Sequence, residues 1–254
     1  MKGFKKILLF FSIVNFAFSQ FTAGTYSNIE PRYTIDLPTA GVLKEKMFAV
    51  DFDFFSGGGV LVSVDAGALE NFNLGISIGG ERIIGSGKVD FQKYPAIKMK
   101  YRFLDEKKSQ PAVAIGFDLQ GRGSWIDSLE RFEIKSRGIF LTASRNYSYY
   151  GNLSLHFGAN YSFEKKDHDI SPNLFFGLEK SLGTASSFLL EYDFALNDDA
   201  EKSLGSNFGY LNSGIRTSFG NGFTIEIDYK DIFLNRKNST LGYRAMKIEF
   251  VNSF

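Results

Sequence analysis

The side chains best suited to covalent catalysis are Ser154 and His156, which stand two residues apart. Both side chains point to the same face of an extended chain, because side chains alternate across a strand. A catalytic serine–histidine pair is defined by its geometry and not by closeness in sequence. We therefore interpret His156 as a hydrogen-bonding residue and assign no catalytic residue.

The sequence gives little indication of a metal site or a phosphate site. The chain has no cysteine, which excludes disulfides, thiolate ligands and a cysteine nucleophile. His168 lies in a polar run with too few ligands at fixed spacing for a metal ion. The glycines at 57–59 indicate a turn without a following helix to cradle a phosphate, and Asn197-Asp198-Asp199 lacks the closing Glu of a calcium loop. The sequence predicts no metal and no cofactor.

The remaining chemistry lies in charged residues that alternate with apolar ones. Between Ile97 and Phe103 every second residue is apolar, and Lys98, Lys100 and Arg102 fill the positions between. An extended strand with this pattern has one apolar and one charged face. Across the chain, the pattern assigns the following charged residues to a common inner face: Asp51, Asp53, Lys98, Lys100, Arg102, Asp118, Glu191, Asp193, Arg216, Glu226, Asp228 and Lys230.

The stretch from Asn152 to Glu164 shows what kind of strand carries this face. Its apolar and polar residues alternate over thirteen positions, whereas an ordinary strand has about five or six residues. A tilted strand that crosses a bilayer needs about 9–11 residues. The pattern therefore predicts a membrane-crossing strand that is apolar toward lipid and polar toward a lumen.

Twelve segments of this kind follow the first 43 residues. The facing of the sixth segment stays undecided, because its apolar residues do not alternate clearly. The expected strands cover residues 44–55, 60–68, 71–84, 95–104, 111–120, 132–145, 152–164, 173–182, 187–196, 209–219, 223–232 and 243–254. An even strand number places both termini on one side, and the longer connections then fall mostly on the other side, as in outer-membrane barrels.

The N-terminus has the pattern of a secretory signal peptide. Lys2, Lys5 and Lys6 precede an apolar run, and Ala17-Phe18-Ser19 supplies the small residues of a cleavage site. The run is too short for a membrane-spanning helix, which needs about 20 residues. We expect a signal peptide over residues 1–19, a periplasmic lead-in over 20–43 that could tuck into the barrel mouth, and a barrel over 44–254.

The fold class predicted is all-β: an antiparallel transmembrane β-barrel of about 12 strands in the cell outer membrane. A soluble barrel would turn its apolar face inward, but the aromatic outward positions favour a membrane barrel with aromatic girdles. We expect many of the charged groups to pair across the lumen. The net charge of +1 gives no indication of nucleic-acid binding.

The last residue, Phe254, follows alternating apolar residues and resembles the sequence by which barrel-assembly machinery recognises outer-membrane proteins, although Asn252 departs from that pattern. Four further stretches resemble the YjbH-like outer-membrane family, which is associated with exopolysaccharide production: residues 37–41, 79–85, 114–118 and 209–216. The resemblance implies a non-enzymatic accessory in polysaccharide export, with outer-membrane lipid and polysaccharide or export proteins as partners. The alternatives are a general small-solute pore and a barrel enzyme that acts on lipid.

Overall fold

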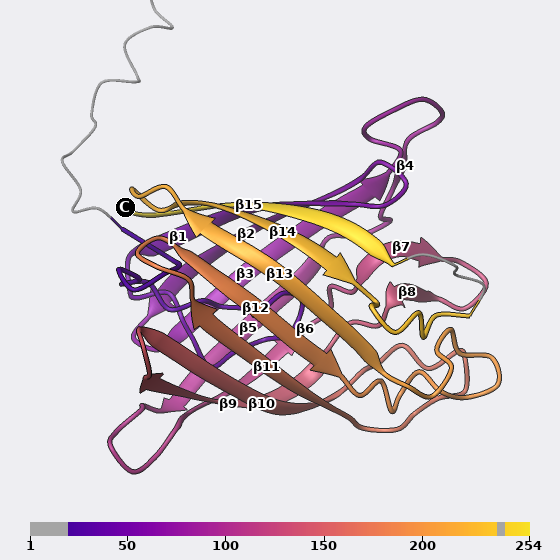
Figure 1. Ribbon diagram of the computed structural model, residues 1–254. Coiled ribbons are helices and arrows are strands. Elements are labelled where there is room, and N and C mark those ends of the chain that lie inside the picture. Colours follow the sequence, from indigo (N-terminus) through magenta and orange to yellow (C-terminus); the bar gives the residue numbers. More distant parts are fainter. Residues whose placement is uncertain (1–19, 238–241) are drawn as a thin grey trace, which may run out of the picture.

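The computed structural model describes residues 20–237 and 242–254. Twelve antiparallel strands pair edge to edge, and the last pairs with the first, so that the sheet closes into a barrel (Figure 1). In order around the barrel, the strands are β1 (Met47–Phe55), β2 (Gly59–Leu69), β3 (Phe72–Glu81), β5 (Ala96–Leu104), β6 (Ala112–Asp118), β9 (Gly138–Ser148), β10 (Asn152–Tyr161), β11 (Asn173–Ser181), β12 (Ser186–Asp193), β13 (Tyr210–Ser218), β14 (Phe223–Lys230) and β15 (Tyr243–Ser253). The predicted 12-stranded barrel is confirmed.

Three short strands lie outside this ring of twelve. β4 (Asp90–Phe91) pairs antiparallel with the last two residues of β3, whereas β7 (Arg122–Ile126) and β8 (Arg131–Ile134) pair only with each other. The sixth strand expected at 132–145 is therefore wrong in its first residues, since Phe132 to Ile134 belong to the separate hairpin. Gly138 adopts a φ of 60° and marks the change of direction before β9.

Short and long connections sort to opposite ends of the barrel. The turns that follow β2, β5, β9, β11 and β13 lie at the end where β1 begins and β15 finishes. The long connections and the β7–β8 hairpin lie at the other end, which is on the right in Figure 1. Only the turn between β1 and β2 is short at that end. We call the two ends the short-turn end and the long-loop end.

The outer surface is apolar, as the alternation predicted. On β5, Ile97, Met99, Tyr101 and Phe103 are exposed, whereas Lys98 and Lys100 are buried inside the barrel. Exposed aromatic side chains gather toward both ends of the strands, including Tyr147, Phe219 and Phe223 at the short-turn end and Tyr161, Phe194 and Tyr229 at the long-loop end. An apolar band between aromatic girdles is the outer surface of a transmembrane barrel. No helix in the described part of the chain is long and apolar enough to span a membrane.

The sequence left undecided which side chains of the sixth expected strand face inward, and β9 shows this. Ile139 and Leu141 face outward, while Phe140, Thr142 and Ser144 are buried inside. Phe140 turns inward because Gly116 on the neighbouring β6 leaves room: a Cβ at Gly116 would lie 2.1 Å from the Phe140 ring. The signal peptide predicted for residues 1–19 lies outside the described residues.

Candidate functional site: a charged lumen closed by the N-terminal segment

The segment before β1 runs into the barrel (Figure 1). Residues 20–29 follow the short-turn rim, where Thr25 and Tyr26 donate backbone hydrogen bonds to the carbonyls of Gly183 and Thr184. Residues 30–43, here called the plug, then enter the lumen and return to the same end at β1. Most of the plug is buried, and Thr34 and Leu37 are only 1% exposed. Of the lead-in expected over residues 20–43, residues 30–43 thus fill the barrel interior, and residues 20–29 follow its short-turn mouth.

The plug is a tight hairpin with its tip at Ile35 and Asp36. Tyr33 bridges Pro38, and Thr34 donates its backbone N–H to the carbonyl of Leu37 over 2.9 Å. A hairpin this short forms few hydrogen bonds within itself. Its other buried N–H and C=O groups therefore need hydrogen-bond partners from outside the plug. Side chains of the wall supply them.

The wall binds the plug main chain with charged side chains. One carboxylate oxygen of Glu191 accepts hydrogen bonds from the N–H groups of Ile35, Asp36 and Leu37 at 2.9–3.1 Å. Arg216 donates to the carbonyls of Tyr33 and Thr34 at 3.0 and 2.6 Å. In the same way Lys247 donates to the carbonyl of Ile35, and Lys100 to those of Arg32 and Thr39.

Arg32 anchors the plug to three carboxylates of the wall. Its guanidinium contacts both oxygens of Asp51 at 2.7 and 2.9 Å, Glu249 at 2.6 Å, and Asp65. Asp51 and Glu249 lie opposite each other on β1 and β15. Without Arg32 these carboxylates would lose their shared counter-charge and repel one another at short range.

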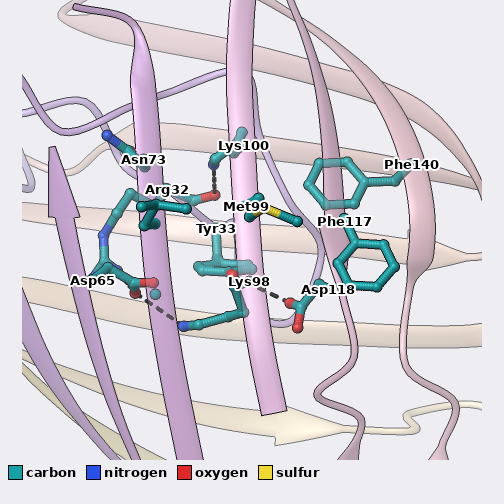
Figure 2. A pocket seen from close by; sticks show the side chains of 12 residues that line it. Arg32, Tyr33, Asp65, Asn73, Lys98, Met99, Lys100, Phe117, Asp118 and Phe140 are labelled. Carbon is teal, nitrogen blue, oxygen red and sulfur yellow. Dashed lines mark hydrogen bonds and ion pairs between the residues drawn. The ribbon is translucent and has the colours of Figure 1, made fainter. Parts of the chain in front are cut away.

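Tyr33 fills the lumen beside Arg32 (Figure 2). Its ring lies 5.8, 5.5 and 5.6 Å from the charged groups of Lys98, Lys100 and Arg122. Cations attract the face of an aromatic ring at such distances. Its hydroxyl donates to Asp118 over 3.3 Å.

Asp36 carries the opposite charge at the plug tip. Its carboxylate accepts from Lys230 at 2.9 Å and from Arg122 at 3.3 Å. Lys230 is the last residue of β14, and Arg122 opens the β7–β8 hairpin. The plug tip therefore reaches the long-loop end and is held by an outer loop as well as by the wall.

All twelve charged residues predicted for the inner face point into the barrel. Seven of them form hydrogen bonds with the plug: Asp51, Lys100, Arg102, Asp118, Glu191, Arg216 and Lys230. Lys98 pairs with Asp65, Asp193 with Arg137, and Glu226 with Arg216 and Lys247. Asp53 lies 3.9 Å from Arg122, and both oxygens of Asp228 lack a hydrogen-bond partner within the described residues. The expected pairing thus runs through the plug and along the wall more than directly across the lumen.

Several partners of these residues escaped the sequence analysis. Asp65 sits at an inward position of β2, directly after Val60, Val62 and Val64 in the same alternation, so the pattern contains the information needed to find it. Arg32 and Asp36 lie in an irregular segment with no period, and no pattern distinguishes them from ordinary loop residues.

The long loops fold over the lumen through a buried ion network. Arg131 is fully buried and contacts Asp167 at 2.6 Å and Asp198 at 2.5 Å, while Lys135 contacts Asp167 at 2.8 Å. Burial alone would raise the pKa of the Asp167 carboxyl, but Lys135 and Arg131 hold that pKa below its ordinary value. This network ties the β7–β8 hairpin to two other loops and so positions Arg122 against the plug tip.

The larger cavities lie at the two ends of the barrel. A cavity of about 560 Å³ opens at the short-turn end beside Glu30 and Ser154, and one of about 460 Å³ opens at the long-loop end beside Tyr94 and Trp125. Deeper in the lumen, the voids beside Arg32, Tyr33 and Asp36 are about 20 to 50 Å³. Such voids have room for single water molecules, so the plug closes the lumen to solutes.

The residues first considered for catalysis take structural roles here. Ser154 donates to Asn146 at 2.5 Å, whereas His156 Nδ1 lies 2.7 Å from the hydroxyl of Ser144. The Ser144 hydroxyl also accepts from the backbone N–H of Ala40 in the plug. In the described residues no three histidine, aspartate or glutamate side chains converge in a way that could hold a metal ion.

Comparisons with known proteins bear on the fold. No protein-family model and no curated protein sequence matches the chain. Among solved structures, the KdgM porin aligns with a TM-score of 0.50 at 11% identity, over 82% of this chain and 99% of its own. The NanC porin aligns with a TM-score of 0.45 at 9% identity, over the same shares of the two chains. The KdgM porin likeness supports the fold alone: this chain has the closed antiparallel barrel architecture of a porin.

Proposed function

We propose that this protein is a porin-like channel of the outer membrane that passes small polar solutes, and that the plug closes it in the conformation described. The carrying observation is the combination of an apolar outer band with a charged lumen that is filled by the N-terminal segment of the chain. An apolar exterior matches lipid, and a polar interior matches water and solutes. The fold likeness to the KdgM porin supports this proposal.

The plug is built so that it can leave without disturbing the barrel. In the described chain, the backbone hydrogen bonds of residues 30–43 outside the strands stay within the plug, and only side chains join it to the wall. Both ends of the plug lie at the short-turn end, so the hairpin can withdraw there without threading. The strand ladder that holds the barrel closed is left intact.

A second candidate is the accessory role in exopolysaccharide export, with polysaccharide or export proteins as partners. One observation favours it: the plug fills the lumen. If the plug never leaves, the barrel would serve as an anchor or scaffold without a transport path. This role predicts that the protein never conducts and that a deletion strain secretes or retains less polysaccharide. Normal secretion and retention in that strain would refute it.

Conductance in planar bilayers tests the channel proposal. The first variant replaces residues 30–41 by glycine and serine at the same length, which removes the plug contacts and keeps every wall residue. We expect steady conductance from this variant and only brief openings from the wild-type protein. No conductance from the variant, when heat-modifiable gel migration shows that it is folded, would refute the channel.

A disulfide lock provides the matched control, because the chain has no cysteine of its own. A Cβ at Gly177 would lie 3.2 Å from the Cβ of Thr34, slightly less than the separation of about 3.5–4.5 Å in a disulfide. Oxidised T34C/G177C protein should stay closed, and a reductant should restore the wild-type openings. Equal openings in both states would mean that current does not depend on the plug.

A further inference from the structure

The plug places two opposite charges in two separate sites of the wall. Arg32 occupies a cation site formed by Asp51, Asp65 and Glu249. Asp36, four residues later, occupies an anion site formed by Arg122 and Lys230. The two sites lie at different depths, because the cation site is in the middle of β1 and the anion site is at the long-loop end of β14.

The wall between these sites binds a peptide main chain. Glu191 accepts from three consecutive N–H groups, and Arg216, Lys247 and Lys100 donate to carbonyls. These contacts do not depend on the side chains of the segment that is bound. Any short peptide presents the same donors and acceptors.

We propose that the open lumen selects short peptides that carry one cationic and one anionic side chain. Asp51, Asp65 and Glu249 bind the cationic group, Arg122 and Lys230 bind the anionic group, and Glu191 and Arg216 hold the main chain between them. The plug is then a tethered stand-in for the solute. This inference rests on the proposed channel function and names the solute class of that channel.

Electrostatics favours such a solute over a neutral one once the plug has left. The cation site keeps three carboxylates within reach of one guanidinium. Among the described residues, only Asp65 has a further ion-pair partner on the wall, Lys98 at 2.9 Å. The anion site keeps two cations that lose the carboxylate of Asp36, while Asp53 stays 3.9 Å from Arg122. Neighbouring charges of like sign with few counter-charges attract an opposite charge more strongly in a narrow, partly dehydrated lumen than in water.

A solute competes with the plug for the same wall groups, and the plug has the advantage of being tethered to the barrel. A segment on a short linker acts at an effective concentration in the millimolar range. The wild-type protein should therefore admit the solute only at high concentration. The full-length variant with glycine and serine at 30–41 has no such competitor and is the better material for the test.

The test compares two pentapeptides with blocked termini in planar bilayers. The first, acetyl-Arg-Gly-Gly-Gly-Asp-amide, has the spacing of Arg32 and Asp36, and the second, acetyl-Gln-Gly-Gly-Gly-Asn-amide, is its uncharged counterpart. The current through the glycine–serine variant should be interrupted by the charged peptide at a concentration about tenfold lower, because hydrogen bonds to charged groups exceed neutral ones by about 1.4 kcal/mol or more. D51N/E249Q in the same variant should remove this preference.

Two controls separate the possible failures. E130Q changes an exposed ion pair with Lys166 outside the lumen and should leave the preference unchanged. A folded variant that conducts but is interrupted equally by both peptides would overturn the peptide proposal and leave the channel standing. A folded variant that does not conduct would overturn both.

Discussion

Replacing Arg32 by Gln tests how the plug is held. The guanidinium is 4% exposed, and it is the shared partner of Asp51, Asp65 and Glu249. Glutamine keeps a polar side chain of moderate length but removes the charge. The three carboxylates would then face one another with Lys98 as the nearest remaining cation, 2.9 Å from Asp65.

The expected cost follows from burial. Removing one partner of a buried ion pair costs about 3–5 kcal/mol, because the other charge stays buried without compensation. Lys98 still compensates Asp65, and water can enter the site, so we take the lower value. A loss of about 3 kcal/mol raises the fraction of molecules with a withdrawn plug about a hundredfold, at 1.4 kcal/mol for each factor of ten.

Modification of a single cysteine measures that fraction. Thr34 is 1% exposed, and its hydroxyl has no hydrogen-bond partner in the described residues, so T34C should cost little. The chain has no other cysteine. The rate at which a water-soluble maleimide modifies T34C should rise about a hundredfold when R32Q is added, since modification requires opening.

Arg102 offers the matched control, because R102Q also breaks a plug–wall ion pair. Its partner Glu30 is about half exposed, with 52% of its side chain accessible. Exposed pairs contribute about 0.2–1 kcal/mol, so R102Q should change the rate less than about fivefold. An R32Q rate equal to that of T34C alone, or equal effects of R32Q and R102Q, would refute the burial argument.

Three further predictions address other contacts. E191A removes the acceptor of three plug amides and should speed T34C modification. E191Q keeps an amide oxygen as acceptor and should have the smaller effect. Equal modification rates in the two variants would contradict this. The lowered pKa of Asp167 means that its stabilising contribution is complete above the ordinary value of 3.8 and is lost as pH falls through the lower folded-state pKa. Fluorescence of Trp125, the single tryptophan, should therefore stay constant down to about pH 4 and change below it, whereas a change between pH 7 and 5 would argue against this assignment. G222A should lower thermal stability more than G183A. Both glycines have positive φ, but of the two only Gly222 lies where an added Cβ would meet backbone, 1.7 Å from the Val251 carbonyl oxygen. Equal losses of stability would show that φ alone matters.

The alternation of residues was sufficient to predict the wall. On β5 the exposed Ile97, Met99 and Tyr101 and the buried Lys98 and Lys100 lie on the predicted sides. Side-chain direction along a strand is a local property with a period of two, so it can be read without knowledge of partners. Where the alternation failed, as in the run Ile139-Phe140-Leu141, the side of each residue depended on Gly116 of a neighbouring strand.

Only the tertiary structure decided that the lumen is closed. The contacts that hold Arg32 and Asp36 join residues separated by up to 217 positions in the chain, as between Arg32 and Glu249. No periodicity marks such residues, because their partners meet only after the barrel has closed and the register of every strand is set. The sequence by itself determined a charged lumen inside an apolar wall, and three-dimensional packing determined that the protein's own N-terminal segment occupies that lumen.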